Sequence, residues 1–193
     1  YKPSEHRYLA RWIDSIEFDH YGDGHCVVVD ADDSLYCTQD FIVTHNTCWL
    51  ARRIIWWGLT RYPWKVGCTA PSSGQMFDAL WSELAKWHAK MPDDFKSHFE
   101  WKAERFEWTK NPAVCYAVAK TARRETPEAL AGLHSEHMLF IIDESPGVDD
   151  IIFETARGAM STRGSKTIMT GNPTRLSGYF FDEFHKSRQH WAT

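Results

Sequence analysis

The sequence lacks the features that mark membrane, secreted and zinc-binding proteins. It has five cysteines, an odd number, and none of them forms a Cys-x-x-Cys pair. This pattern argues against a disulfide framework or a zinc ribbon and for a reducing cytosol. No stretch is long and apolar enough to span a membrane, and no signal peptide is recognisable. We therefore expect a cytoplasmic protein without a membrane partner.

Two further absences concern charge and phosphate binding. The formal net charge of the 193 residues is −4, which gives no overall basic signature for nucleic acid. The Gly-x-x-x-x-Gly-Lys-[Ser/Thr] loop that cradles phosphates in many nucleotide hydrolases is also missing. No internal repeat is present, which excludes a solenoid or propeller architecture.

Charge is distributed unevenly along the chain. Residues 1–46 carry three basic and nine acidic side chains, whereas residues 47–193 carry nineteen basic and seventeen acidic ones. This shift predicts two parts with a boundary after Asn46. A chain that begins at Tyr1 rather than at a methionine is expected to be a fragment.

The first part has the composition of β-strands. Apolar and β-branched residues recur over residues 7–18, 25–30, 35–38 and 41–44, with turn-forming residues between them. Residues 1–46 are therefore predicted to be all-β. They are too short to be stable alone and need a partner for their apolar faces.

The boundary coincides with a tripeptide that can support cleavage of the backbone. The side-chain amide of Asn46 can attack its own carbonyl carbon, and His45 can donate a proton to the departing amine. The hydroxyl of Thr47 can accept an acyl group as a nucleophile. The tripeptide alone is a weak signal, because it also occurs by chance in the turns of ordinary β-hairpins.

The residues before the tripeptide resemble the C-terminal splicing region of an intein. Residues 34–46 read Ser-Leu-Tyr-Cys-Thr-Gln-Asp-Phe-Ile-Val-Thr-His-Asn, and the resemblance extends over residues 7–46. It implies the all-β Hint-type fold and protein splicing without a cofactor. It also implies that His45 is the penultimate histidine, Asn46 the cyclising residue and Thr47 the first residue of the C-extein.

The resemblance to inteins has departures and gaps. Ser34 stands where many relatives have His, and Cys26 stands near the position of an assisting Asp that some relatives replace by Cys. The blocks that carry the first splice nucleophile and the Thr-x-x-His motif are absent. The implied partner is therefore a complementary N-terminal intein and N-extein fragment, without which this chain is not expected to complete splicing.

The second part has the pattern of an α/β domain. Ser72 and Gln75 are predicted to form a capping box at the start of an amphipathic helix. The aromatic side chains at 101, 106 and 108 fit base stacking or, as we favour, strand packing. Helices are predicted over residues 48–60, from 72 to 87, from 149 onward and over 177–186, and strands over 66–70, 99–108, 114–118, 138–142 and 166–170.

An apolar strand over residues 138–142 ends in two carboxylates, as in the Walker B pattern of nucleotide hydrolases. Ligands bind at this end of the strands in open α/β sheets. Asp143 is expected to help hold Mg²⁺, and Glu144 to orient and polarise the attacking water. After the next strand, Thr170 and Asn172 provide polar groups for sensing the γ-phosphate.

Thr47 directly precedes the first apolar helix, where the Ser or Thr of a phosphate loop belongs. An intein inserted between the Lys and the Thr of that loop explains both halves. Thr47 is then first the splice nucleophile and later a ligand of Mg²⁺. The Gly-Lys of the loop and the adenine-contacting segment are expected on the N-extein.

Four segments in this order resemble the ATPase domain of phage terminase large subunits: residues 69–75, 130–137, 141–147 and 170–180. The resemblance implies an α/β P-loop NTPase fold with a mainly parallel sheet, incomplete here. It implies ATP and Mg²⁺ as cofactors and movement of double-stranded DNA into a procapsid. The implied partners are the portal, the small terminase subunit and further copies of the chain, in a phage-infected bacterium.

The same resemblance makes residues 170–172 the motif that couples hydrolysis to movement. Arg123 or Arg124 can supply a finger to a neighbouring subunit, and an ordinary solvated pair is an equal alternative. Our main interpretation is an intein C-terminal segment whose splicing restores a terminase ATPase. The alternative is a terminase-like or helicase-like ATPase with an unrelated β-rich N-terminus, although a helicase-like protein does not share the motif at 170–180.

Overall fold

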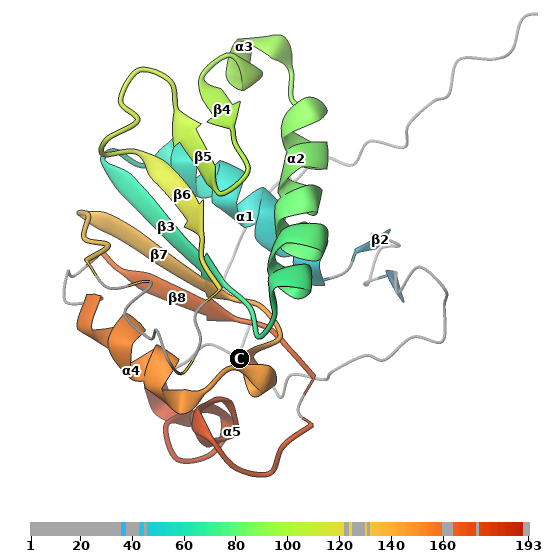
Figure 1. Ribbon diagram of the computed structural model, residues 1–193, viewed down its shortest axis with the longest axis vertical. Coiled ribbons are helices and arrows are strands. Elements are labelled where there is room, and N and C mark those ends of the chain that lie inside the picture. Colours follow the sequence, from blue (N-terminus) through green and yellow to red (C-terminus); the bar gives the residue numbers. More distant parts are fainter. Residues whose placement is uncertain are drawn as a thin grey trace, which may run out of the picture.

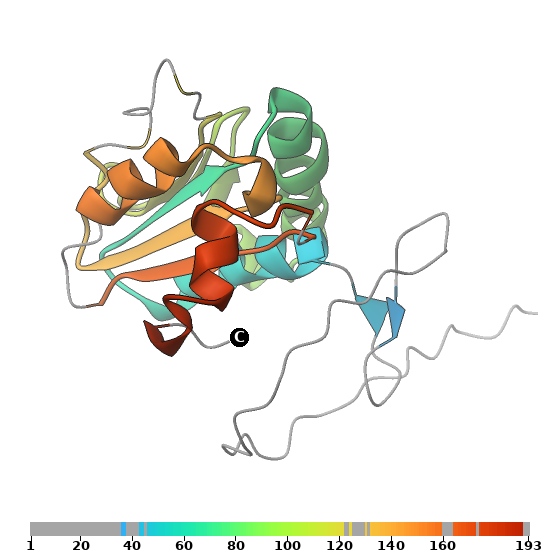
Figure 2. The same ribbon diagram turned by 90° about the horizontal axis from the view of Figure 1, so that it is seen from below.

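The computed structural model describes residues 36–37, 43–44, 46–121, 124, 130, 132–159, 164–172 and 174–190. The strands predicted over residues 7–18 and 25–30 lie outside these ranges, as do Cys26 and His45. Figures 1 and 2 show a twisted sheet between two layers of helices. None of the helices in the described ranges combines the length and apolar character that a membrane crossing demands.

Two short strands precede the α/β domain. β1 (Tyr36–Cys37) and β2 (Val43–Thr44) pair antiparallel, with Tyr36 opposite Thr44. They agree with the strands predicted over residues 35–38 and 41–44. The all-β class of the rest of the first part stays a prediction.

A six-stranded sheet has the strand order β4-β5-β6-β3-β7-β8. Its central and distal strands β6, β3, β7 and β8 run parallel, whereas β5 runs antiparallel to both β4 and β6. The predicted α/β class with a mainly parallel sheet is therefore confirmed. The strand bounds are β3 (Trp64–Thr69), β4 (Phe99–Trp101), β5 (Arg105–Trp108), β6 (Tyr116–Ala119), β7 (His137–Ile142) and β8 (Lys166–Met169).

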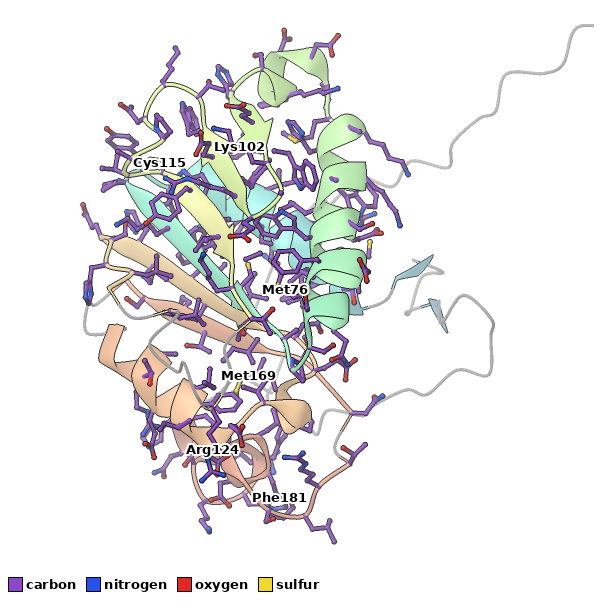
Figure 3. The ribbon with its side chains drawn as sticks, in the orientation of Figure 1. Met76, Lys102, Cys115, Arg124, Met169 and Phe181 are labelled. Carbon is purple, nitrogen blue, oxygen red and sulfur yellow. The ribbon has the colours of Figure 1, made fainter. Side chains whose placement is uncertain are left out.

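The helices cover both faces of the sheet because β7 is apolar on both sides. Leu139 and Ile141 belong to the core under α1 (Asn46–Thr60) and α2 (Ser82–Ala89), whereas Phe140 belongs to the core under α4 (Asp150–Ala159). Met76 and Met169 belong to these two cores respectively (Figure 3). The short elements are η2 (Gln75–Trp81), α3 (Asp93–Lys96), η4 (Ser145–Gly147), α5 (Tyr179–Phe184) and η5 (Arg188–His190).

The helix predicted from residue 72 begins with the π-helical turn η2. Gln75 donates its backbone N–H to Ser72 Oγ at 3.2 Å, and Ser72 Oγ donates to Gln75 Oε1 at 2.9 Å. Only the first of these bonds belongs to a capping box, in which the glutamine bonds the backbone N–H of the cap residue. Because a π-turn holds more residues than an α-turn, Met76 is fully buried and Phe77 only partly.

The predicted strand over residues 99–108 is a hairpin. Lys102 and Arg105 close the turn between β4 and β5 through reciprocal backbone bonds of 2.6 and 3.4 Å. Phe106 is fully buried and stacks on Phe99, with ring centroids 4.8 Å apart. Packing, rather than base stacking, therefore explains Phe106.

Candidate active site

The parallel strands β3, β7 and β8 end at one edge of the sheet, and backbone hydrogen bonds continue past their ends. Asp143 donates its N–H to the carbonyl of Thr69, and Thr170 donates its N–H to the carbonyl of Ile142, each at 3.0 Å. Thr69, Asp143 and Thr170 therefore stand in a row at the carboxyl ends of the three strands, where ligands bind in α/β sheets.

The carboxylate of Asp143 is the centre of this row. Only 2% of the residue is exposed. Its Oδ1 accepts hydrogen bonds from Thr170 Oγ1 at 2.7 Å and from the N–H of Glu144 at 3.1 Å. Its Oδ2 lies 3.4 Å from Thr47 Oγ1, although the two residues are 96 positions apart in the sequence. The fold thus brings together Thr47, Asp143, Glu144 and Thr170.

Thr47 reaches Asp143 because α1 begins at this edge of the sheet. The helix starts at Asn46, two residues earlier than predicted, so Thr47 lies in its first turn. The first backbone N–H groups of a helix have no partner within the helix and attract anions. The turn that holds Thr47 therefore suits a phosphate. For Asn46 the structure describes the backbone only.

Glu144 has a strained backbone. Its φ of 50° and ψ of 44° make it the only non-glycine residue with positive φ among the described residues. Such a conformation costs a non-glycine residue about 1–2 kcal/mol. Strain of this kind gathers at functional sites. Burial, and then the charge of Asp143, raise the pKa of Glu144.

The loop after β8 contacts the turn that follows Glu144. Ser145 donates its N–H to the carbonyl of Thr170 at 2.7 Å. Gly171 has a φ of 152°, and a Cβ there would lie 2.4 Å from Pro146 Cδ. Only glycine fits this contact without displacing the turn. Thr170 donates its hydroxyl proton to Asp143, so in this structure it orients that carboxylate.

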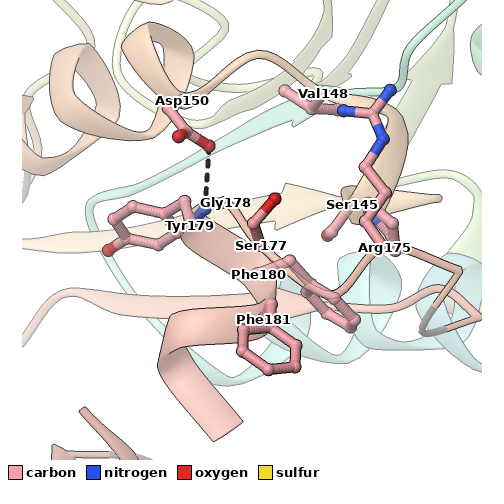
Figure 4. Close-up of a pocket in the computed structure, with 10 residues that line it drawn as sticks. Ser145, Val148, Asp150, Arg175, Ser177, Gly178, Tyr179, Phe180 and Phe181 are labelled. Carbon is pink, nitrogen blue, oxygen red and sulfur yellow. Dashed lines mark hydrogen bonds between the residues drawn. The ribbon is translucent and has the colours of Figure 1, made fainter. Parts of the chain in front are cut away.

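A small cleft lies behind the site, between η4 and α5. Asp150 Oδ1 accepts a hydrogen bond from the N–H of Tyr179 at 2.8 Å, which ties the start of α5 to α4 (Figure 4). The cavity measures about 20 Å³, enough for about one water molecule. In Figure 4 the side chain of Arg175 extends past Ser145 toward Val148. This cleft is too small for a nucleotide.

The sequence did not reveal the supporting residues. Thr69 is fully buried at the end of β3 and holds Asp143 through its carbonyl. Ser145 donates its hydroxyl to the carbonyl of Ile142 at 2.7 Å. A polar residue at the end of a buried strand was the available signal for Thr69. Arg124 is exposed, and Arg123 lies outside the described residues.

The oxygens of Thr47 and Asp143 fit the needs of Mg²⁺. Two adjacent ligands of an octahedral Mg²⁺ lie about 3 Å apart, and Thr47 Oγ1 and Asp143 Oδ2 are separated by 3.4 Å. Within the described ranges, no three His, Cys, Asp or Glu side chains gather as a metal site. Mg²⁺ does not need such a cluster, because it binds one or two protein groups together with phosphates and waters.

A cysteine next to the site is chemically inert. Cys68 is fully buried in β3, and burial, followed by the nearby charge of Asp143, raises the pKa of its thiol. Because the thiolate is the reactive form, we expect Cys68 to take no part in chemistry. The reactive groups at this edge are therefore oxygens.

The fold and this edge define an α/β domain with a mostly parallel sheet and a hydroxyl- and carboxylate-lined carboxyl end. Its fold is that of the large terminase from a thermophilic bacteriophage. Two solved forms of that terminase, one in complex with ADP, match with a TM-score of 0.56 and 14% and 15% identity, over 74% of this chain and 34% of that chain.

The sequence is similar to the probable terminase, large subunit, of Enterobacteria phage P7. The two are 36% identical over 97 residues, which is 47% of this chain and 20% of that protein. This chain thus spans about a fifth of that relative and about a third of the solved thermophilic terminase. No model of a known protein family matches.

These similarities support the predicted resemblance to terminase large subunits. They give no support to the intein that was expected over residues 1–46. That part of the interpretation stays a prediction.

Proposed function

We propose that residues 47–193 are part of the ATPase domain of a phage DNA-packaging motor. The observation that carries the proposal is the position of Thr47 Oγ1 beside Asp143 Oδ2, 3.4 Å apart at the carboxyl edge of the sheet. The likeness to terminase large subunits, one of them solved with ADP, supports it. By the same proposal the partners are double-stranded DNA, the portal, the small terminase subunit and further copies of the chain.

In this proposal the residues divide the work of hydrolysis. Thr47 and Asp143 hold Mg²⁺, which when bound neutralises charge on the phosphates. Thr170 and the N–H of Glu144 fix the rotation of the Asp143 carboxylate, so that Oδ2 faces Thr47. Glu144 accepts a proton from the attacking water. Its raised pKa makes it a better base than an exposed glutamate.

The free edge of β8 offers a place where a further strand could pair. β8 is the last strand of the described sheet, and Thr167, Ile168 and Met169 are only partly buried. The helix that carries Thr47 begins at the carboxyl edge of the same sheet. We propose that, in the active protein, a strand leading into the Gly-Lys of the phosphate loop pairs along β8 and is supplied by the N-extein.

The test is an ATPase assay on two proteins. Residues 47–193 joined behind a segment that carries the strand and the Gly-x-x-x-x-Gly-Lys loop are expected to hydrolyse ATP in the presence of Mg²⁺. The chain of 193 residues as it stands is expected to show none, because its sequence lacks the Gly-Lys of the loop that holds the β- and γ-phosphates. Hydrolysis by the unjoined chain would contradict the split phosphate loop.

We propose as a second function that residues 1–46 act as the C-terminal segment of an intein. The observation behind it is a coincidence at one residue. Thr47 follows the expected cyclising Asn46 and also occupies the place of the hydroxyl residue of a phosphate loop, in contact with Asp143. Because the Asn46–Thr47 bond lies in the first turn of α1, cleavage requires that this turn opens.

Mixing the chain with a matching N-terminal intein fragment is expected to release a species that begins at Thr47, or a ligated product. Asn46→Ala is expected to abolish that release, because no amide remains to cyclise, whereas the control Asn111→Ala is expected to behave as wild type. Intact-mass spectrometry measures both. If Asn46→Ala releases the same species as wild type, splicing is wrong and the N-terminus is an unrelated β-rich segment.

A further inference from the structure

A hollow of about 320 Å³ opens between α1 and α2, on the side of these helices away from the sheet. We call it the basic aromatic groove and define it by Arg52, Trp56, Leu59, Trp87 and Lys90. Trp56 is 43% exposed and Leu59 37% exposed, which is unusual for side chains of this size and character. The groove is therefore apolar at its floor and cationic at its walls.

The cations of this face lie on the tryptophan rings. The guanidinium of Arg52 lies 3.7 Å from the ring centroid of Trp87, and that of Arg61 lies 4.3 Å from the ring centroid of Trp56. Lys90 Nζ lies 5.2 Å from the ring centroid of Trp87. The aromatic faces thus hold the cations in place.

These cations have no carboxylate partner within the described ranges. No ion pair forms there with Arg52, Arg53, Arg61 or Lys90. Glu83, the acid nearest along α2, is already bonded to Lys86 at 3.1 Å and to the indole N–H of Trp87 at 2.9 Å. Burial, and then repulsion by Arg53, lower the pKa of Arg61. Among the described residues, the positive charge of this face therefore has no compensating carboxylate.

The stacking selects the kind of ligand that fits. The guanidinium groups of Arg52 and Arg61 lie over indole rings, and Arg61 donates one N–H to Thr60 Oγ1 at 2.6 Å. The N–H groups along the edge of a guanidinium suit carboxylates. The same stacking covers ring surface that a nucleobase would need. An apolar floor also suits side chains better than a phosphate backbone. The matching ligand is a peptide that is both acidic and apolar.

The N-terminal segment of the same chain has this chemistry. Residues 1–35 contain eight acidic and three basic side chains, interspersed with large apolar ones such as Trp12, Ile13 and Phe18. The segment is also connected, through β1 and β2, to the start of α1, the helix that carries Arg52, Trp56 and Leu59. Tyr36 pairs with Thr44, two residues before α1 begins.

The distance to be covered is short. Arg52 lies six residues into α1, about 9 Å along the helix axis from its start. A tether of this length gives a high effective concentration of the segment at the groove. Weak individual contacts therefore suffice for docking.

We propose that residues 1–35 dock in the basic aromatic groove of the same chain. Their carboxylates pair with the guanidinium edges of α1 and with Lys90, and their apolar side chains fill the hollow beside Trp56 and Leu59. The proposal does not depend on the segment being an intein. Where splicing also holds, removal of the segment uncovers the groove in the mature protein.

Zero-length carbodiimide cross-linking of the full chain tests the docking. Lys90 and Lys86 are expected to link to acids within residues 1–35, whereas the exposed Lys110 and Lys186 serve as controls on other surfaces. The double variant Arg52→Glu, Arg53→Glu reverses charge beside the groove and leaves both lysines in place. It is expected to lower the yield of these cross-links roughly five- to tenfold. Salt is expected to lower the yield as well.

Three results overturn the proposal. The first is a yield at Lys90 and Lys86 that is no higher than at the control lysines in the wild-type chain. The second is a set of links found only between isotopically mixed copies, which shows that a second copy occupies the groove. The third is binding of a single-stranded oligonucleotide that requires Arg52 and Arg53 while no links to residues 1–35 form.

Discussion

Asp143→Ala is expected to lower the free energy of unfolding of the full chain by about 2–4 kcal/mol. The carboxylate accepts two hydrogen bonds, from Thr170 Oγ1 and from the N–H of Glu144, and faces Thr47 Oγ1 at 3.4 Å. Alanine removes this acceptor from the hydroxyl of Thr170 and from the N–H of Glu144, both on half-buried residues. Relief of a buried charge offsets part of the loss. Urea unfolding measures the difference.

Asp143→Asn is the matched control. An amide oxygen in the place of Oδ1 still accepts from Thr170 and Glu144, and the amide N–H₂ can donate to Thr47 Oγ1. The free energy of unfolding is therefore expected to change by less than about 1 kcal/mol. In the reconstituted ATPase domain, both variants are expected to lower the rate of ATP hydrolysis by about 10³, since neither holds Mg²⁺ as a carboxylate does.

The pair of variants separates structure from catalysis. Full activity of Asp143→Asn in the joined protein would remove Asp143 from the proposed Mg²⁺ site, whatever its effect on stability. An Asp143→Ala chain as stable as wild type would show that the hydrogen bonds around the carboxylate do not hold the edge of the sheet together.

The sequence was informative where a periodic pattern coincides with burial. The apolar run before Asp143 predicted β7 because a parallel strand covered on both faces has no polar side, and β7 is that strand. The helix over residues 48–60 was predicted because its apolar residues cover much of its surface, as in a helix that packs on a sheet. Its true start at Asn46 depends on tertiary contacts of Thr47, which no local pattern contains.

Other features of the site depend on contacts distant in sequence. The left-handed backbone of Glu144 precedes a turn in which Ser145 and Pro146 contact the loop after β8. Gly171 is an ordinary loop glycine in the sequence, and only the approach of Pro146 shows that a side chain cannot fit. The π-turn at Gln75 is likewise invisible to an α-helical pattern, because it shifts the buried face by one residue.

Glu144→Gln is expected to lower the rate of ATP hydrolysis of the joined protein by about 10²–10⁴ and to leave ATP binding intact. Gln has the same shape and the same backbone preference, so the strained turn at φ 50° is preserved. The amide cannot take a proton from water. A fluorescent ATP analogue measures binding, and phosphate release measures hydrolysis. Equal losses in both would assign Glu144 to binding instead.

The pH dependence of hydrolysis by the joined protein with Glu144 intact gives a second test of the same residue. The proposed base, Glu144, must be a carboxylate to accept a proton. Burial, followed by the charge of Asp143, raises its pKa. An exposed glutamate has a pKa of about 4.3. As the pH is lowered, hydrolysis is therefore expected to begin to fall at a higher pH than it would with an exposed glutamate as the base. Stability responds in the opposite sense. Because the ionised form is disfavoured in the fold, the contribution of Glu144 to stability is lost as pH rises through its folded pKa.

Two further variants test whether the pH dependence of hydrolysis and of stability comes from Glu144. Asp143→Asn removes the second cause of the shift, so the pKa of Glu144 followed by NMR is expected to fall part of the way toward that of an exposed glutamate. Glu144→Gly, in contrast, removes the base and also relieves the left-handed strain. It is expected to raise the free energy of unfolding by about 1 kcal/mol while hydrolysis is lost. A gain in stability together with a loss of hydrolysis would support the proposed role of Glu144 in chemistry, and an unchanged rate of hydrolysis would contradict it.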